Sequence, residues 1–438
     1  MWPTVPTVAG TFFPLRAALG LDEHGYSSSV IEHIVTATAR FSSFRDATYA
    51  VQMSRIAISE SQVRRLACEV GQELIEQRER KVVEHRRRQL CGRTKVIPEA
   101  VVVEVDGGRI RTRAARSASG VHEAQNKEDK IACLATLRSS TFASDPQPEP
   151  PKSFQCPRRV QRLVRQMKGQ AGDANTQEIP EEPAVSTMEP HTEESTKRWS
   201  PERLVRTCVA SLETSTSFGP MMAAEACERN FYRASRRAFV ADGSAYNWSI
   251  QEGYFGEFEP IVDFLHVLCY VYSSAHAVSA DESLGWSQYL VWMRACWQGQ
   301  VEEVVNELDQ WQTRQGQPPP GEPKSAEDRR DPRRLVHEAR SYLRNNRNRM
   351  AYPRYRQMGL PTTSSLVESL VGEFNARVKS KQKYWTRPSG AESILQLRAA
   401  LLSEDDRLSR YFANRSGCTF RKRPQPKNST SLPTQTAA

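Results

Sequence analysis

Two short apolar runs of this chain end in the same dipeptide, and this repeated ending constrains the fold more than any other feature. Residues 101–105 lead into Asp106-Gly107, and residues 238–241 lead into Asp242-Gly243. A short run of β-branched and apolar residues predicts a buried strand. An Asp-Gly pair alone more often marks a simple turn. Ligands collect at the carboxyl ends of strands in α/β sheets, however, so neighbouring strands of this kind would bring both carboxylates to one site.

Further segments complete the expected sheet. Gly107-Gly108 should end the first strand, because glycine pairs commonly mark turns. The other expected elements are strands at Ile110–Arg113 and Lys130–Leu137, helices from Pro201 towards Thr214 and from Ala223 to Arg237, and a fifth strand at Ile261–Phe264. This order predicts an α/β fold with a mixed sheet flanked by helices.

A third carboxylate lies on a predicted helix near the end of the chain. The apolar stripe of this helix is Val367, Leu370, Val371, Phe374 and Val378. Glu368 lies at the edge of the stripe, so docking the stripe on the sheet would direct its carboxylate along the sheet surface. Lys379 follows on the same line and would reach outward to a phosphate. Clustered carboxylates repel one another unless a cation neutralises them, so Asp106, Asp242 and Glu368 are candidate ligands of Mg²⁺.

The N-terminal part of the chain has helical spacing. Helices are expected from near Ser29, over Phe41–Gln52, and after Ser59-Glu60-Ser61-Gln62, which has the form of a capping box. The arrangement resembles a helix-turn-helix unit whose last helix would present Arg64 and Arg65 to a DNA groove. An ordinary three-helix module with a solvated basic face is the equal alternative.

Charge and cysteine usage narrow the partner and the compartment. The 438 residues include 61 Lys and Arg against 51 Asp and Glu, a formal charge of +10 that favours a polyanionic partner. The nine cysteines stand singly, without a C-x-x-C pair, as expected of reduced thiols in a cytoplasmic protein. The most apolar window, residues 261–280, contains Asp263, His266 and His276, so we expect core structure rather than a membrane span.

The expected organisation has seven parts. They are a helix-turn-helix module and basic linker (1–96), a first core segment (97–143), a low-complexity and mostly disordered insert (144–200), a second core segment (201–282), a helical insertion (283–359), a catalytic helix and following helix (360–415), and a disordered basic tail (416–438). A short basic helix near Arg158–Lys168 should interrupt the insert. The helical insertion is expected to be a separate body.

With these elements in order, the chain resembles the bacterial insertion-sequence DDE transposases of the Kra-type family, which have an RNase H-like catalytic core. The resemblance runs from about Phe13 to Tyr411, with the insert excepted. It is carried by residues 105–109 (VDGGR), 127–132 (KEDKIA), 241–248 (ADGSAYNW), 263–266 (DFLH), 348–352 (NRMAY), 360–369 (LPTTSSLVES) and 387–399 (RPSGAESILQLRA). Each motif is weak alone, and together in this order they are fairly specific.

The resemblance implies an activity and a set of site residues. Asp106, Asp242 and Glu368 would be the catalytic metal ligands for two Mg²⁺ or Mn²⁺ ions, used to cut and join DNA at element ends. His266 falls in a D-x-x-H pattern and would orient the scissile phosphate or a metal-bound water, although a structural histidine is an equal alternative. The family's basic and aromatic segment matches Lys379, Lys381, Lys383 and Trp385, where the tryptophan either stacks on a frayed base or packs in the core. The family also implies a homo-oligomer in a bacterial cytoplasm, associated with the nucleoid.

Two departures leave other functions open. Relatives generally carry more sequence before the helix-turn-helix region, and the insert at 144–200 is longer than the compact pattern. A truncated or co-opted derivative that binds DNA without catalysis is therefore the alternative, although all three carboxylates are present. A host nuclease of the same fold is disfavoured by the patterns around Glu368 and Gly390.

Overall fold

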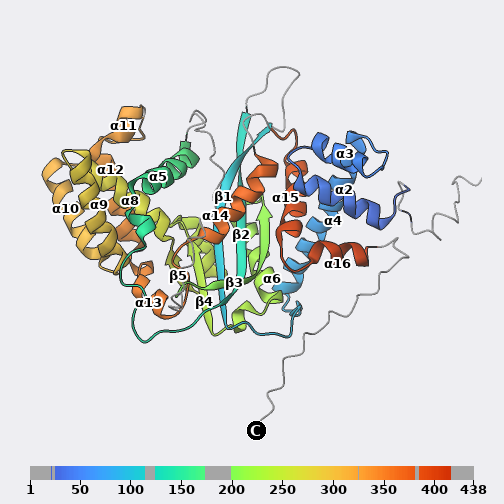
Figure 1. Cartoon of the computed structure of the whole chain (residues 1–438), viewed down its shortest axis with the longest axis horizontal. Coiled ribbons are helices and arrows are strands. Elements are labelled where there is room, and N and C mark those ends of the chain that lie inside the picture. Colours follow the sequence, from blue (N-terminus) through green and yellow to red (C-terminus); the bar gives the residue numbers. More distant parts are fainter. Residues whose placement is uncertain are drawn as a thin grey trace, which may run out of the picture. The chain divides into compact units, whose positions relative to one another are not determined.

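The computed structural model describes residues 21, 25–113, 124–172, 199–323, 325–379 and 384–415 (Figure 1). The chain divides into two compact units, which we name the N-terminal unit (Met1–Ala67 with Asp406–Ala438) and the central unit (Cys68–Asp405). This division differs from the boundary predicted at residues 96 and 97. The reason is that helix α4 (Glu60–Arg86) is continuous and crosses from one unit into the other.

The N-terminal unit contains the helices predicted for this region. They are α2 (Ser28–Arg40), α3 (Phe44–Met53) and the start of α4, followed at the other end of the chain by α16 (Arg407–Asn414). Serine hydroxyls cap the first three, because Ser27, Ser43 and Ser59 each accept a hydrogen bond from a backbone N–H of the first turn. A small apolar core that includes Ile34, Val51 and Leu66 holds the helices together.

The central unit is built on one mixed five-stranded sheet flanked by helices, with strand order β3-β2-β1-β4-β5 (Figure 1). The strands are β1 (Ala100–Arg113), β2 (Ala124–Arg138), β3 (Glu202–Ser211), β4 (Arg236–Ala241) and β5 (Glu259–Val262). Strands β1, β2 and β3 are antiparallel neighbours, whereas β4 and β5 continue parallel to β1. The predicted α/β class is confirmed at this level.

The predicted end of the first strand and the predicted helix after Pro201 were both wrong. Gly107-Gly108 does not end the first strand, because β1 continues through both glycines and includes Ile110–Arg113. A Cβ atom on Gly107 would lie 2.6 Å from the backbone oxygen of Asp129, so this glycine permits close strand pairing rather than a turn. The segment after Pro201 is strand β3 rather than a helix, since pairing with β2 overrides its weak local pattern.

Helices cover the sheet and extend beyond it. The α-helices are α5 (Pro157–Gly172), α6 (Ser215–Glu228), α7 (Ala245–Tyr254), α8 (Phe264–Val278), α9 (Glu282–Trp297), α10 (Val301–Gln315), α11 (Ala326–Arg330), α12 (Pro332–Asn346), α13 (Tyr352–Gln357), α14 (Ser365–Val378) and α15 (Pro388–Leu402); short 3₁₀ turns are η1 (Lys152–Gln155), η2 (Phe231–Arg233) and η3 (Arg347–Arg349). The predicted helical insertion is no separate body, because α9 and α12 pack directly on α8. Among the described helices, none is long and apolar enough to cross a membrane.

Much of the segment predicted to be disordered is folded. Residues 144–172 are described, and they include the basic helix expected near Arg158, which is α5. Arg356 donates to both carboxylate oxygens of Asp145, with 2.7 Å from Nε to Oδ1. The ring of Phe154 lies 5.6 Å from that of Phe264 and 5.9 Å from that of Trp297. A few anchoring side chains thus order a stretch whose composition favours disorder. Residues 173–198 and 416–438 lie outside the described part.

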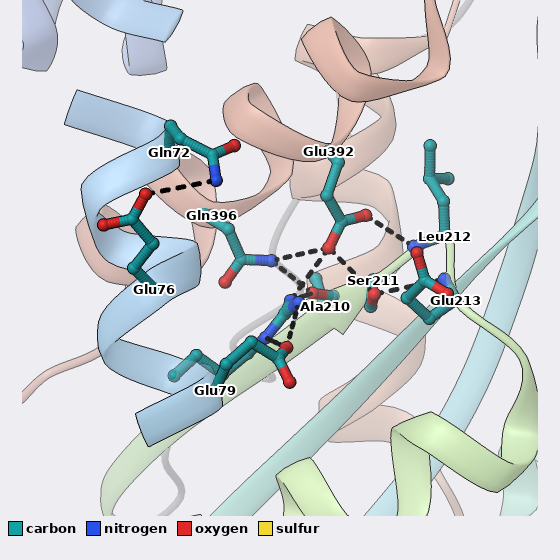
Figure 2. Close-up of polar contacts among 10 residues, drawn as sticks. Gln72, Glu76, Glu79, Ala210, Ser211, Leu212, Glu213, Glu392 and Gln396 are labelled. Carbon is teal, nitrogen blue, oxygen red and sulfur yellow. Dashed lines mark hydrogen bonds and ion pairs between the residues drawn. The ribbon is translucent and has the colours of Figure 1, made fainter. Parts of the chain in front are cut away.

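A polar network fastens the second half of α4 within the central unit (Figure 2). Glu392 of α15 accepts hydrogen bonds from the Ser211 hydroxyl at 2.8 Å and from the Leu212 N–H at 2.7 Å. Arg78 of α4 adds an ion pair to the same carboxylate at 2.8 Å. The crossing of α4 and α15 is close, because a Cβ on Gly71 would lie 2.6 Å from the Ser393 Cβ. Strand β3, α4 and α15 are therefore fixed to one another.

Candidate active site

The two Asp-Gly pairs lie side by side, at the same end of the paired stretch of the inner strands β1 and β4. The last paired residues of the parallel strands β1 and β4 are Val105 and Ala241, so Asp106 and Asp242 each come directly after the paired stretch. Both line a cavity of about 660 Å³. The other polar residues that line it include Glu128, His266, Asn375 and Lys379. The structure therefore brings both predicted aspartates, the predicted histidine and one predicted lysine to a single site.

The Asp106 carboxyl holds its proton more tightly than an ordinary aspartic acid. Burial raises its pKa to about 6, and the negative charge of Asp242 acts in the same direction. A hydrogen bond of 2.7 Å from the Gly107 N–H to Oδ1 opposes this shift, as does the charge of His266. Burial, more than neighbouring charge, therefore sets the proton affinity of Asp106.

Asp242 is held by the first turn of the helix that follows it. Its Oδ1 accepts from the Ser244 N–H and the Asn247 side-chain amide, each at 2.9 Å, and its Oδ2 accepts from the Ser244 hydroxyl at 2.8 Å. Its backbone oxygen accepts from the Tyr342 hydroxyl at 2.9 Å. Gly243 has φ of +93°, and a Cβ there would lie 2.7 Å from the Tyr342 ring. The turn after β4 thus requires glycine and fixes the orientation of Asp242.

Glu368 lies close enough to Asp106 to feel its charge, but it does not line the cavity. It stands in the first turn of α14, and the pKa of its carboxyl is raised to about 8, first by burial and then by the charges of Asp263 and Asp106. Its Oε1 lies 3.5 Å from the Ser364 hydroxyl. Among the described residues, no three His, Cys, Asp or Glu side chains are grouped so that they could hold one metal ion as they stand.

Two buried carboxylates hold the start of α14, and the sequence analysis assigned neither of them this role. Glu104 of β1 accepts from the Val367 N–H at 2.8 Å, and Asp263 accepts from the N–H and the hydroxyl of Ser364 at 3.0 and 2.8 Å. Neither side chain is exposed. Burial raises the pKa of Glu104 to about 8. Glu104 could have been noticed, because it is an acid inside a valine run and shares a strand face with Asp106.

Two further acceptor side chains, those of Asp129 and Asn375, lie next to Gly108 on β1. Asp129 of β2 is fully buried, and neither carboxylate oxygen has a partner from another described residue. A Cβ on Gly108 would lie 3.0 Å from Oδ1 of Asp129 and 3.6 Å from Oδ1 of Asn375, which is unpartnered in the same sense. Burial raises the pKa of Asp129 to about 6, against the opposing charges of Lys379 and Lys130.

The other predicted site residues fall in different places. Lys379 is exposed at the cavity, whereas Lys381 and Lys383 lie outside the described residues. Trp385 is half-buried, and its indole N–H donates to the Val378 oxygen at 2.9 Å, which favours packing over base stacking. Arg64 and Arg65 are exposed on α4 in the N-terminal unit.

The donor set of the cavity suits a divalent cation in part. Asp106 and Asp242 offer adjacent hard oxygens, and a bound cation would stabilise the charged form of Asp106, whose pKa is raised first by burial and then by the charge of Asp242. Glu368 would join them only after its side chain turns from Ser364 towards the cavity. A scan against protein-family models and a search of curated proteins each return no match for this chain. The geometry of the cavity is therefore the basis for assigning its chemistry.

Proposed function

We propose that this chain is a DDE transposase whose central unit is an RNase H-like catalytic core that cuts and joins DNA. The observation that carries the proposal is the meeting of Asp106 and Asp242 in one cavity, each directly after the last residue that pairs the adjacent parallel strands β1 and β4. Glu368 supports it, because the charge of Asp106 lies close enough to raise the pKa of the Glu368 carboxyl. The strand order is compatible with an RNase H-like sheet.

Each residue of the cavity has a role in this proposal. Asp106 and Asp242 would hold Mg²⁺ or Mn²⁺, with Glu368 as a third ligand. The bound metal would supply activation of a water or a DNA 3′-hydroxyl and stabilisation of the leaving oxygen. Lys379 would contact a phosphate beside the scissile bond, and His266 would orient the scissile phosphate.

Support for DNA as the substrate comes from charge. The chain carries a net charge of +10, and the exposed arginines Arg64 and Arg65 lie on one helix of the N-terminal unit. That unit would bind element ends, as a helix-turn-helix module does. The sign of the charge suits a polyanion, and the cavity supplies the carboxylates that phosphoryl transfer requires.

The decisive experiment measures strand cleavage and joining by the full chain on DNA that carries the ends of its own element. Wild type is compared with Asp106→Asn, Asp242→Asn and Glu368→Gln in Mg²⁺ and in Mn²⁺. Glu303→Gln, an exposed position on α10, is the matched control for the change of charge. Metal-dependent products that vanish in the three site variants and persist in the control would support the proposal.

A second candidate function is DNA binding without catalysis. The position of Glu368, which does not line the cavity with the two aspartates, favours it. In that case the wild-type chain would bind the element ends, and neither metal would yield cleaved or joined strands. Binding without product in wild type would therefore replace the transposase proposal with this one.

A further inference from the structure

Helix α5 (Figure 1) carries four exposed arginines to which the proposed function gives no role. They are Arg158, Arg159, Arg162 and Arg165, and we name them the α5 arginines. The helix has no Asp or Glu in its sequence, and the nearby Glu282 accepts from the Gln161 amide at 3.4 Å. Within the described part of the chain, no hydrogen bond or ion pair joins the side chain of an α5 arginine to another residue. Their positive charge is therefore not offset by the described residues.

The opposite face of α5 fixes the helix in place. Val160 and Val164 are buried, and the helix packs on α8. Successive residues of an α-helix turn by about 100°, which places Arg158, Arg162 and Arg165 on the side away from these valines. The arginines thus point to solvent, and the contacts that hold α5 do not depend on them.

The placement of these charges is unfavourable for the helix alone. Arg158 and Arg162 are four residues apart, and Arg162 and Arg165 are three apart, so like charges are neighbours on the helix surface. Arg158 and Arg159 also lie in the first turn, where the helix dipole already presents positive charge. A helix face that is only solvated gains stability when acids are mixed among its bases. A polyanion bound to α5 would relieve both kinds of repulsion.

The spacing of the α5 arginines suits a DNA backbone. From Arg158 to Arg165 the helix rises by roughly 10 Å, because each residue adds about 1.5 Å. One strand of duplex DNA carries roughly three phosphates over that length, at about 3.4 Å each along the axis. The three arginines of this stripe can therefore meet three phosphates of one strand.

The position of α5 relates these arginines to the candidate active site. Met167, on the last turns of the helix, lines the cavity that contains Asp106, and its Sδ lies 3.0 Å from the Sγ of Cys269. Met167 is on the packed side of α5, whereas the arginines are on the outer side. DNA that touches the α5 arginines is therefore outside the cavity, and these side chains do not reach the reacting phosphodiester.

We propose that the α5 arginines bind the phosphate backbone of duplex DNA that flanks the segment held in the cavity. The inference rests on the proposed function, because it takes DNA as the substrate. Charge complementarity selects this occupant, since four cations on a helix without acids suit a polyanion. The contact holds the duplex beside the cavity and is independent of base sequence.

The first test removes charge from α5 in the full chain. The triple variant Arg158→Gln, Arg162→Gln, Arg165→Gln is compared with a control that removes three exposed arginines elsewhere in the central unit, Arg138→Gln, Arg233→Gln, Arg314→Gln. Affinity for a fluorescent DNA duplex is measured by anisotropy over a series of salt concentrations.

Three lost phosphate contacts should reduce the salt slope by about 2.7, because each contact to a duplex contributes about 0.9. Over the tenfold range from 1 M to 0.1 M salt, that change in slope corresponds to a roughly 500-fold loss of affinity. The loss should be equal for a duplex with the element ends and for one of unrelated sequence. The control should retain nearly the wild-type slope.

The second test separates binding from folding. The matched variant Arg158→Lys, Arg162→Lys, Arg165→Lys keeps the charge and should keep a slope close to that of wild type. The free Gln variant should unfold at the wild-type temperature or above it, because its helix has lost like-charge repulsion. A lower unfolding temperature would overturn the inference, since the arginines would then hold the fold. Arg162→Gln alone should reduce the slope by about 0.9.

The two proposals fail in different ways. A Gln triple variant with wild-type slope and affinity, or equal losses in that variant and its control, would overturn the inference about α5. That result would leave cleavage by wild type, and its loss in Asp106→Asn, untouched. Conversely, a triple variant that loses duplex binding while wild type makes no product in either metal would retain α5 as a DNA contact and reject the transposase.

Discussion

The two halves of strand β1 differ in almost every physical property. Residues 100–105 lie between two neighbouring strands and bury their valines fully. This half of the strand also carries Glu104 and, at its end, Asp106, whose pKa values burial raises. Residues 107–113 leave the sheet with one partner strand and present arginines on one face. One strand therefore passes from a buried segment with acidic side chains to a partly exposed segment with basic ones. The comparison teaches that a single strand can carry a buried acidic segment and a partly exposed basic one, with Gly107-Gly108 as the border.

The largest effect is expected from the acidic half. Asp106→Asn should lower the rate of strand cleavage by at least about 100-fold, because losing a direct metal ligand costs more than losing its outer partners, which cost about 10- to 100-fold. The measurement is single-turnover cleavage with saturating protein. Full activity in this variant would remove Asp106 from the chemistry and erase the functional difference between the two halves.

Asp129 is an exception to the comparison, because a buried carboxyl lies opposite Gly108 in the basic half. Its pKa is raised from 3.8 to about 6, so the folded state binds the proton more tightly than the unfolded chain. This contribution to stability is full below pH 4 and is lost as the pH rises through 6. Asp129→Asn does not titrate, so relative to wild type it should gain up to about 3 kcal/mol between pH 4 and pH 7.

Urea unfolding of both proteins at pH 4 and pH 7, with a chelator present, checks this expectation. Glu303→Gln serves as the exposed control and should follow the wild-type profile. If the free energy of unfolding depends on pH in the same way for wild type and Asp129→Asn, the Asp129 carboxyl has an ordinary pKa. The basic half would then contain no exception.

The next effect concerns the hydrogen bond from Val367 to Glu104. Glu104→Leu leaves that N–H buried without a partner, which should lower the free energy of unfolding by about 2 kcal/mol. Glu104→Gln keeps an acceptor oxygen and should retain most of the stability and of the cleavage rate. Equal behaviour of the two variants in urea unfolding and in cleavage would mean that the acidic half does not position α14.

The smallest effect tests the border itself. A Cβ on Gly107 would lie 2.6 Å from the Asp129 backbone oxygen, whereas a Cβ on Gly108 would lie 3.0 Å from a carboxylate oxygen at the end of a side chain. Gly107→Ala should therefore cost about 1 kcal/mol or more in thermal unfolding, because backbone must move. Gly108→Ala should cost less, since the Asp129 side chain can adjust. A larger loss of stability in Gly108→Ala than in Gly107→Ala would contradict the placement of the border at these two glycines.

Local sequence patterns predicted those features that depend on near neighbours. The start of α4 follows from the capping pattern at Ser59, and the positions of Asp106 and Asp242 directly after apolar strand residues follow from apolar runs of known length. That both aspartates line one cavity required only that β1 and β4 be neighbours.

Features that depend on distant partners could not be predicted in this way. Gly107 has the appearance of a turn residue until Asp129 is known to lie against it. The bond between Glu104 and Val367 joins residues 263 positions apart, and nothing local indicates it. Strand β3 begins with charged residues, so its local sequence does not indicate a strand. Its pairing with β2 is what makes it one. Composition likewise did not predict that residues 144–172 are folded. A few specific contacts, such as the hydrogen bond from Arg356 to Asp145, order a segment that is polar on average.

The contacts that Tyr342 makes with the turn after β4 limit how far this protein can be shortened. Tyr342 belongs to α12, inside the helical insertion, yet its hydroxyl binds the Asp242 backbone and its ring covers Gly243. A shortened chain made by excising residues 283–346 would therefore lose part of the scaffold that orients Asp242, so the helices after α8 cannot be removed without disturbing the turn that follows β4.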